Sequence, residues 1–382
     1  MTFSASAQTN DTPEVREYNR IKRRLTIADL LINVVFLVVL LATGWSATLR
    51  DWAYGAAGQS YSLAVFFYVA MLLVISKALG FGLDYYSFRL EHQFNLSNQK
   101  LKSWLWDETK GWLVGLVIAT ILVEMIYNVI RLEPGVWWLI VWVVYNALAI
   151  FFAQIAPVVL FPLFYKFTPL ENDELSKRLI KLSEKAGTRV RGVYEWKLSE
   201  KSKKANAALA GLGATRRIIL ADTLIENYTS DEIEAVLAHE LGHHVHKHIL
   251  KSIALQIGVS LIGFWVVAQA LNFAVEKEFF PMLHDFASVP LLVLLTTVMS
   301  FLLMPIMNAY SRQKEREADR YSLESIPAVG PFISSMNKLA DQNLAERNPS
   351  RFVEIWFHSH PPIGKRIAAA QDFQSSVANP NS

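Results

Sequence analysis

The stretch His239-Glu240-Leu241-Gly242-His243 determines how the rest of this chain is interpreted. On a helix, residues four positions apart lie on one face, so His239 and His243 can direct their imidazoles at a single metal ion. Glu240, one position further round the helix, is placed to accept a proton from a water molecule at that ion. The pattern is short enough to arise by chance, so its surroundings decide whether it marks a catalytic site.

Composition limits both the class of protein and the kind of metal site. The 382-residue chain contains no cysteine, which excludes disulfides and thiolate ligands and leaves His, Asp and Glu to bind a metal. A net charge of +3 gives no reason to expect a nucleic-acid partner. The mean hydropathy of +0.25, with 11 Trp and 22 Phe, instead predicts an integral membrane protein whose partner is the lipid bilayer.

Six apolar runs are each about 20 residues or longer, which is the length needed to cross a bilayer. They lie near residues 27–45, 61–82, 112–130, 136–164, 250–273 and 290–307. A cleaved signal peptide is the alternative for the first run. That run is longer than a usual signal core and follows a long polar leader, so we predict an uncleaved anchor. The expected fold is therefore mainly α, with about six transmembrane helices.

The distribution of Lys and Arg predicts the orientation of these spans. Basic residues are concentrated before the first run, after the second, between the fourth and fifth, and after the sixth, whereas the other loops carry few. The positive-inside rule therefore predicts both termini and the His239 motif in the cytoplasm. Since the sequence shows no transit peptide or retention tail, we expect a multi-pass protein of a bacterial cell (inner) membrane, or of the endoplasmic reticulum in a eukaryote.

The main soluble insertion lies between the fourth and fifth spans. Residues 171–186 are expected to form an amphipathic helix and residues 190–198 and 217–220 short strands, with a loop or hairpin tip at 199–215. The whole chain then divides into a cytoplasmic leader (1–26), a four-helix membrane region (27–164), a cytoplasmic segment with the motif helix (165–248), two further spans (249–310) and a cytoplasmic tail (311–382).

The motif helix has a clear predicted start. Thr229 is a suitable N-cap, and Glu232 three residues later completes a capping box. No proline occurs from there to Phe280. We therefore expect the motif helix to run directly into the fifth span, which would bring the metal close to the membrane surface.

Two histidines leave a zinc ion short of one protein ligand, because a catalytic site has three ligands and an open position. The sequence offers His244, His246, His248 and distant carboxylates. The metzincin spacing is absent, and His246 lies about 10 Å along the helix axis from His239, too far to share its ion. These three histidines and Lys247 are predicted to form a charged collar at the membrane interface.

A better candidate for the third ligand follows the sixth span. Glu315 and Asp319 are four residues apart on a helical stretch that emerges on the same side as the histidine motif. We therefore assign Glu315 as the third ligand and Asp319 as an acceptor that orients a ligand histidine. Glu317 points elsewhere on the helical wheel and is expected to be solvated.

In these residues and in the motifs below, the chain resembles the type I CAAX prenyl proteases, the Ste24 family of integral-membrane zinc metalloproteases in peptidase family M48. The resemblance extends over most of residues 80–370, with the motifs in the same order. The motifs are Ser87-Phe-x-x-Glu91, Phe94-Asn95, Pro162-Leu-Phe, Phe167-Thr-Pro-Leu170, Asn206, Asp222-Thr-Leu224, His239-Glu-Leu-Gly-His243, Ser311-Arg-x-x-Glu315-x-x-Ala-Asp319 and His360-Pro-Pro-x-x-x-Arg366.

This resemblance implies a gluzincin-type protease domain with a small β-hairpin or sheet, and membrane helices around a large chamber that the zinc ion faces. It implies ligands at His239, His243 and Glu315, and a catalytic base at Glu240. Three further roles follow from it in the same way: Asp319 as proton donor or histidine-orienting residue, His360 as oxyanion donor, and Asn206 and Arg366 as residues on the substrate side. The expected substrate is a peptide or protein with a prenylated or otherwise hydrophobic C-terminus.

The chain departs from the family's eukaryotic members in having about six spans instead of seven and a shorter cytoplasmic segment. This departure concerns the natural substrate more than the chemistry. An alternative is an HtpX-like quality-control protease of membrane proteins, although such proteins usually have about four spans and lack the long N-terminal half. A transporter or scaffold with a vestigial site is the alternative from another class, and the filled catalytic positions argue against it.

Overall fold

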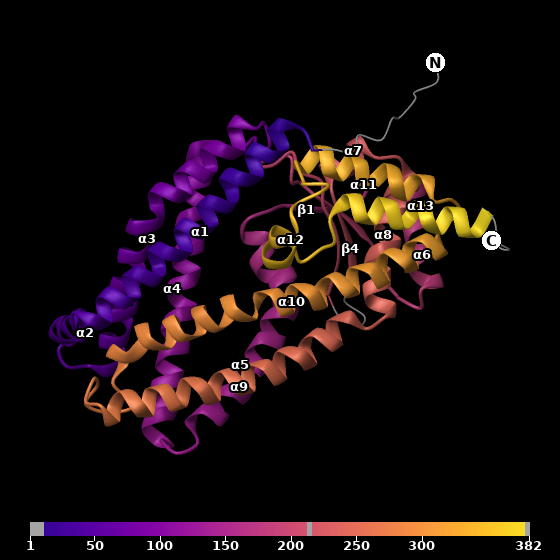
Figure 1. Ribbon diagram of the computed structural model, residues 1–382. Coiled ribbons are helices and arrows are strands. Elements are labelled where there is room, and N and C mark those ends of the chain that lie inside the picture. Colours follow the sequence, from indigo (N-terminus) through magenta and orange to yellow (C-terminus); the bar gives the residue numbers. More distant parts are fainter. Residues whose placement is uncertain (1–10, 212–215, 379–382) are drawn as a thin grey trace.

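The computed structural model describes residues 11–211 and 216–378, and within them the chain is mainly helical (Figure 1). Six helices of the described part are long and apolar enough to cross a membrane, which confirms the predicted number of spans. They are α1 (Pro13–Ala42), α3 (Tyr61–Gln93), α4 (Leu101–Leu132), α5 (Trp137–Ile155), α9 (His248–Glu276) and α10 (Val289–Ser325).

Several of these helices are longer than the apolar runs that predicted them. Helix α1 begins at Pro13, where the Thr12 hydroxyl caps it by accepting the Val15 N–H at 3.2 Å. Helix α3 continues to Gln93, and α10 continues to Ser325. Lys, Arg, Glu and Gln favour a helix as well as most apolar residues do, so the end of the apolar run does not end the helix. The extension of α10 is the part that carries the predicted site residues.

A short helix that the sequence did not predict, α2 (Trp45–Ala56), lies at the end of the molecule opposite the soluble part (Figure 1). It packs on α3 and on the 3₁₀ turn η4 (Phe286–Ser288). Buried hydroxyls pair here, Ser46 with Tyr68 and Tyr127 with Ser288, each at 2.7 Å. These bonds satisfy polar groups that would otherwise be costly to bury.

Helix α5 ends earlier than its apolar run. Pro157 has no amide hydrogen, and the chain passes through a π turn, η1 (Ala156–Leu160), and a 3₁₀ turn, η2 (Phe161–Leu163). Lys110 of α4 stabilises this turn by donating from Nζ to the Leu163 carbonyl at 2.7 Å.

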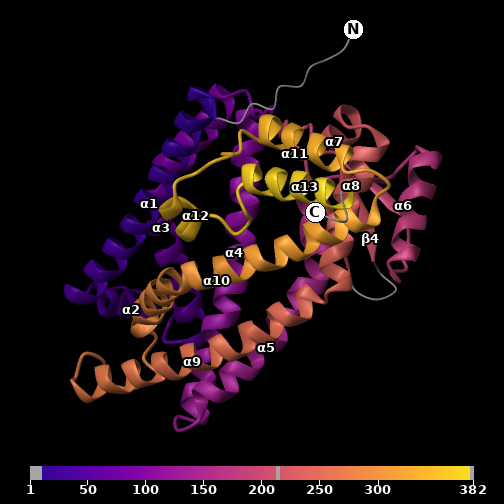
Figure 2. The same ribbon diagram turned by 45° about the vertical axis from the view of Figure 1, so that its right-hand side comes forward.

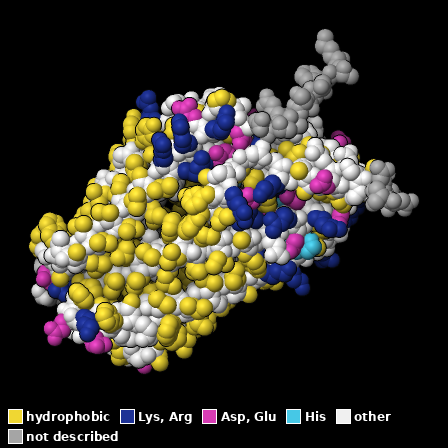
Figure 3. Space-filling model, viewed as in Figure 1, with side chains coloured by type: hydrophobic (Ala, Val, Ile, Leu, Met, Phe, Trp, Pro, Cys, Tyr) yellow, Lys and Arg dark blue, Asp and Glu magenta, His cyan; other side chains and the backbone are white. Residues whose placement is uncertain are grey.

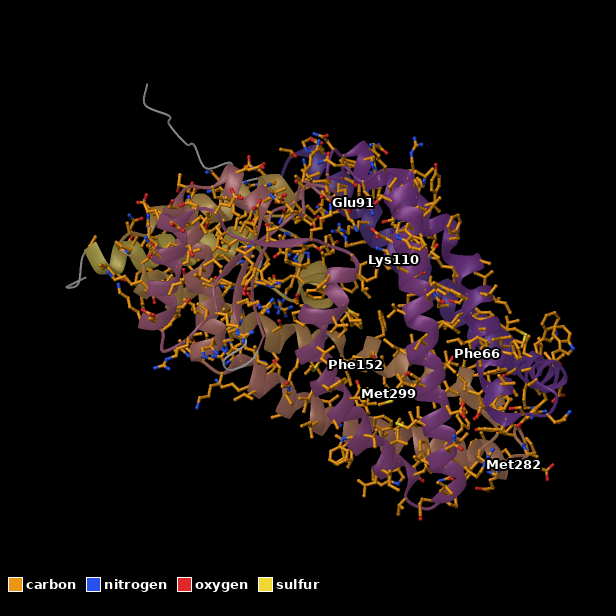
Figure 4. All side chains as sticks on the ribbon, turned by 180° about the vertical axis from the view of Figure 1, so that it is seen from behind. Phe66, Glu91, Lys110, Phe152, Met282 and Met299 are labelled. Atoms are coloured by element: carbon orange, nitrogen blue, oxygen red, sulfur yellow. The ribbon has the colours of Figure 1, made fainter. Side chains whose placement is uncertain are left out.

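Helices α1 and α3 are joined by a hydrogen bond in which Glu91 of α3 accepts the Tyr18 hydroxyl of α1 at 2.6 Å. Figure 4 shows Glu91 and Lys110 toward the soluble part and Met282 at the far end.

The soluble part contains a mixed sheet in the order β1-β2-β4-β3. Its strands are β1 (Phe167–Pro169), β2 (Val193–Trp196), β4 (Arg217–Ala221) and β3 (Ala207–Ala210). The β2–β4 pair is parallel, and the β1–β2 and β3–β4 pairs are antiparallel. The strands β2 and β4 lie where the sequence predicted them. Strand β3 falls in the stretch that we expected to be a loop, because its Ala-Ala-Leu-Ala sequence has little strand propensity.

Helices cover this sheet and build one core with it. They are α6 (Asp173–Lys185), α7 (Asp222–Asn227) and the motif helix α8 (Ser230–Val245). Leu179, Ile218 and Leu220 are fully buried in this core, together with Leu237 of α8. Three C-terminal helices, α11 (Gly330–Asn343), α12 (Arg351–Phe357) and α13 (Ile363–Ala378), pack around α8 and α10 (Figure 2).

The surface divides into an apolar and a charged region, as expected for a protein that spans a membrane. Figure 3 shows hydrophobic side chains over the long helices and Lys and Arg side chains gathered where these helices meet the soluble part. Large apolar side chains such as Val117, Ile121 and Ile262 are exposed on the helices. Such a continuous apolar surface is stable in lipid rather than in water.

The motif helix does not continue into the fifth span, contrary to our expectation. Helix α8 ends at Val245, and Lys247 adopts a left-handed backbone conformation with φ of 55° before α9 begins at His248. A left-handed residue cannot belong to a right-handed helix, so the helix is interrupted here without a proline or glycine.

The predicted capping box of α8 is present, and its glutamate, Glu232, also binds two side chains of α11. The Glu232 carboxylate is buried and accepts hydrogen bonds from the Thr229 amide (2.7 Å), the Ser334 hydroxyl (2.6 Å) and the Lys338 ammonium (2.7 Å). Burial alone would raise the pKa of Glu232, but these donors outweigh it and hold the pKa below its ordinary value.

Replacing Glu232 by glutamine should therefore destabilise the protein at neutral pH, by about 2 kcal/mol, because the three donors lose their charged, buried acceptor. A carboxylate whose pKa is lowered on folding stabilises the folded state above its unfolded pKa, near 4.5, and this contribution is lost as pH falls through the folded pKa. Thermal unfolding in detergent should show a gap in Tm between Glu232→Gln and wild type at pH 7 that narrows below pH 4.5. An equal gap at both pH values would contradict this account.

Candidate metal centre

The two histidines of the motif lie one turn apart on α8 and point the same way. Their Nε2 atoms are 3.2 Å apart. Glu315 of α10 completes the group, with Oε2 3.2 Å from the His239 Nε2 and Oε1 3.3 Å from the His243 Nε2. His239 and Glu315 are buried, and His243 is half-buried. The structure therefore brings together the three residues that the sequence predicted as ligands.

Gly242 permits this close approach of α8 and α10. A Cβ atom at position 242 would lie 2.9 Å from the Cα and 3.0 Å from the carbonyl oxygen of Ala318. Both are backbone atoms, which cannot move without shifting α10. Residues 315 and 319 lie on the same stretch of α10 as Ala318. The glycine of the motif thus sets the distance between the histidines and the acidic residues.

Gly242→Ala should consequently push α10 away and weaken both folding and the site. We expect a loss of stability of about 1–3 kcal/mol, as for other overpacked cores, and at least a tenfold loss of catalytic activity at the site, because a displacement of about 1 Å can cost 100-fold. Thermal unfolding and an activity assay measure the two effects. Gly258→Ala on α9 is the matched control, since a Cβ there meets nothing within 4 Å. Equal behaviour of the two variants would refute this role of Gly242.

Asp319 contacts His239 at Nδ1, the ring nitrogen that does not face Glu315, and Arg366 binds Asp319 in turn. The His239 Nδ1 lies 2.8 Å from the Asp319 Oδ1, so that the ring donates to the carboxylate and turns Nε2 toward Glu315. Arg366 of α13 donates to both Asp319 oxygens, from NH2 to Oδ1 at 2.5 Å and from Nε to Oδ2 at 2.8 Å. We expected Arg366 on the substrate side. Its side chain, only 9% exposed, lies against Asp319 instead.

His360 reaches the group from the loop before α13. Its Nε2 lies 3.4 Å from the Glu315 Oε1, and its ring is exposed on the opposite side, with 61% of the side chain accessible. The Ser359 hydroxyl lies 3.0 Å from the His360 Nδ1. An exposed imidazole beside a buried cluster can meet a substrate that approaches the cluster from solvent.

Glu240 lies between the two histidines on α8 and is half-buried. Burial raises the pKa of its carboxyl, and the nearby Glu315 adds to this, although His239, His243 and Arg366 oppose it. A carboxyl whose pKa lies above its ordinary value is a better proton acceptor near neutral pH, as general-base catalysis requires.

Asn206 lies immediately before β3, at the edge of the sheet that faces α8. Its carbonyl accepts the Ala221 N–H at 3.0 Å, and its side chain is exposed. Within the described residues, β3 pairs on one side only, with β4. The other side of β3 can therefore accept a further strand.

Two residues near the centre have environments that the sequence did not suggest. His248, expected in an exposed collar, is buried and lies 3.0 Å from His243, measured between the Nδ1 atoms. Glu317, expected to be solvated, lies 2.9 Å from the His248 Nε2. The break at Lys247 creates these contacts, and the unbroken helical pattern gave no signal for it.

Comparison with protein families agrees with this geometry over both halves of the chain. Residues 169–374 match the profile of peptidase family M48. Residues 2–166 match the profile described as the CAAX prenyl protease N-terminal region with five membrane helices. Helices α1 to α5 lie in this range, although α2 has only 12 residues, too few to cross a bilayer. The match also disfavours the HtpX-like alternative, for which we expected no such N-terminal half.

Individual relatives lead to the same family. An uncharacterized metalloprotease, YhfN of Bacillus subtilis, is 32% identical over 93% of this chain and 84% of its own length. CAAX prenyl protease 1 of Saccharomyces cerevisiae is 29% identical over 79% of this chain and 71% of its own. The crystal structure of Ste24p from S. mikatae shares the fold, with a TM-score of 0.84 over 93% of this chain and 88% of that one, at 24% identity. The chain therefore belongs to peptidase family M48, as a membrane metalloprotease of the CAAX prenyl protease (Ste24) family.

Proposed function

We propose that this protein is a zinc endopeptidase that cleaves peptides near a prenylated (CAAX-type) or otherwise hydrophobic C-terminus. In this proposal His239, His243 and Glu315 hold a single zinc ion. Glu240 is the catalytic base, His360 stabilises the oxyanion, and Asp319 with Arg366 orients His239. The observation that carries the proposal is the triangle of ligand atoms beside Glu240, at the ends of two membrane helices.

The three residues fit a zinc ion in spacing and chemistry. Zinc binds imidazole nitrogen and carboxylate oxygen at about 2.0–2.2 Å in a tetrahedron, whose ligand atoms are then about 3.3–3.5 Å apart. The two histidine Nε2 atoms are 3.2 Å apart, the Glu315 Oε2 lies 3.2 Å from the His239 Nε2, and the other oxygen, Oε1, lies 3.3 Å from the His243 Nε2. The Glu315 Oε2 is buried and accepts no hydrogen bond in the described part of the chain. When bound, such an ion lowers the pKa of water to about 7 and polarises a carbonyl group.

The chain's own side chains supply the remaining steps. Glu240 accepts the proton of the attacking water and then donates it to the leaving amine. The His360 Nε2–H donates to the oxygen of the scissile carbonyl as negative charge develops there, an interaction of the kind that lowers a barrier by about 3 kcal/mol. Asp319 and Arg366 keep the His239 Nε2 directed at the site throughout.

Two features support a peptide substrate that approaches from the membrane. The open edge of β3 beside Asn206 can pair with an extended peptide by main-chain hydrogen bonds. The second feature is a cavity of about 520 Å³ between α3, α4 and the loop residues Tyr165 and Lys201, lined by both Trp112 and Lys77. We take it as part of a chamber among the spans, where a lipid-modified segment and water both find partners.

We further propose that the metal centre and both termini face the cytoplasm, in a bacterial inner membrane. The basic start of α1 lies against the soluble part, since Asn19 donates to the Leu344 carbonyl and Arg23 pairs with Glu346, and Figure 3 shows few Lys and Arg side chains at the opposite end of the molecule. Because the chain has no cysteine, single cysteines can be placed at Arg320 and Glu276, whose side chains are 76% and 74% exposed. An impermeant thiol reagent added outside intact spheroplasts should label Glu276→Cys and spare Arg320→Cys; the reverse pattern would invert the orientation.

The proposed substrate class is tested with a pair of peptides, one prenylated and one without the lipid. A farnesylated CAAX peptide and its unmodified Cys→Ser counterpart are incubated with purified protein in liposomes, and products are identified by mass spectrometry. Burying a farnesyl chain contributes several kcal/mol, so we expect kcat/KM to favour the farnesylated peptide by on the order of 100-fold. Equal cleavage of both would exclude the prenyl group as the determinant, and cleavage of neither would reject the substrate class.

A further inference from the structure

A series of polar contacts leads from His243 to the surface. It is separate from the contacts that His239 makes with Asp319 and Arg366. The His243 Nδ1 lies 3.0 Å from the His248 Nδ1, and the His248 Nε2 lies 2.9 Å from the Glu317 Oε2. His248 is 3% exposed, whereas the Glu317 side chain is 37% exposed. The amide of Gln313 donates to the other Glu317 oxygen at 3.3 Å. A buried imidazole thus bridges His243 and a half-exposed carboxylate.

This contact depends on the break in the helix at Lys247. In a continuous helix His243 and His248 would lie about 140° apart around the axis and could not touch. The left-handed conformation of Lys247 starts a new helix at His248 and turns its ring back toward His243. Lys314 of α10 holds the new helix in place by donating from Nζ to the Ser252 hydroxyl at 2.5 Å.

The carboxylate fixes the direction of every hydrogen bond in this series. An ionised Glu317 only accepts, so the His248 Nε2 carries the hydrogen and donates it. The neutral His248 ring then has its lone pair on Nδ1 and accepts from the His243 Nδ1–H. His243 is left with its own lone pair on Nε2, the atom 3.3 Å from the Glu315 Oε1. The sequence of bonds therefore selects the tautomer of His243 that can bind a metal.

We propose that His248 is a positioning residue for His243, anchored by Glu317. His248 fixes the orientation and tautomer of the second ligand histidine, as Asp319 does for the first. This inference rests on the proposed ligand role of His243. Helix α10 then supplies two orienting carboxylates: Asp319 contacts His239 directly, and Glu317 acts on His243 through His248. Removal of an orienting partner of this kind typically costs 10- to 100-fold in metal affinity.

Three substitutions of His248 separate positioning from packing. Asparagine places an amide oxygen where the His248 Nδ1 stands and can still accept from His243, but it loses Glu317. Glutamine reaches the position of Nε2 and loses the acceptor for His243. Phenylalanine retains the ring and loses both bonds. The matched control is His246→Gln, because the His246 ring stacks on His248, at 5.5 Å between centroids, rather than bonding to His243.

The measurement is zinc affinity of the detergent-purified full chain by competition with a chelator, alongside thermal unfolding of the zinc-free protein. We expect His248→Phe and His248→Gln to lose about 10- to 100-fold in affinity, with His248→Asn and His246→Gln within about threefold of wild type. Equal affinity of the Asn and Phe variants, whether both high or both low, would overturn the proposal, as would losses that merely follow the zinc-free Tm.

The same titration distinguishes failure of this inference from failure of the proposed function. Wild-type protein that binds zinc, with equal affinities for the His248 variants, overturns only the role of His248. Wild-type protein that takes up no zinc overturns the ligand assignment and, with it, the positioning role. Substrate cleavage does not enter either result, so an incorrect substrate class would leave this test valid.

Discussion

Glu240→Gln should lower kcat for peptide hydrolysis by about 100- to 10,000-fold, the range that general acid–base catalysis contributes. Glutamine has nearly the same size and shape as glutamate but cannot accept a proton from water or return it to the leaving amine. Because Glu240 is not among the three residues whose ligand atoms cluster, the metal content of the variant should equal that of wild type. Stopped assays on purified protein and metal analysis of the same samples measure the two quantities.

The control for this variant is Glu234→Gln on the same helix. Glu234 pairs with Arg178 of α6, away from the centre, so its removal should leave kcat within about twofold of wild type. Retained activity in Glu240→Gln with normal metal content would show that another group acts as the base. Loss of metal in this variant would show instead that Glu240 contributes to holding the ion.

Glu315→Gln should also abolish most of the activity, because it weakens zinc binding and not because it removes the catalytic base. It removes the one negatively charged ligand and leaves two neutral imidazoles, so we expect zinc affinity to fall by more than the roughly 100-fold that an orienting residue can cost. Activity should be undetectable at substoichiometric zinc. Chelator competition gives the affinity, and added zinc should restore little activity.

Glu324→Gln is the matched control on the same helix. Glu324 is exposed and pairs with Arg320 at 2.9 Å, a surface contact of little energetic consequence. Normal zinc affinity in Glu315→Gln would mean that the ion has a different third ligand, with His360, 3.4 Å from Glu315, as the nearest alternative.

Local signals in the sequence predicted much of the fold. Six apolar runs of spanning length correspond to six long helices, and the Thr229 capping box starts α8 at the expected residue. The histidine spacing and the acidic pair on α10 likewise depend on neighbours four residues apart, and the structure brings these side chains together. That they hold zinc stays a prediction.

Features that depend on distant parts of the chain were not predictable in this way. Lys247 has no residue-type preference for a left-handed conformation, so the turn that buries His248 is set by packing of α9 on α10. Strand β3 is made of residues with weak strand propensity and exists because β4 pairs with it. The position of Arg366 behind Asp319 likewise follows from where α13 docks, which no local pattern specifies.

Peptide hydrolysis by this protein should depend on a zinc ion held by His239, His243 and Glu315. The most direct test strips metal from purified wild-type protein with a chelator, returns zinc in steps, and measures bound zinc and peptide cleavage in the same samples. The account predicts that activity is absent without zinc, rises in proportion to bound zinc and is complete at equimolar zinc. Cleavage by the metal-free protein, or full recovery of activity in Glu315→Gln at equimolar zinc, would contradict it.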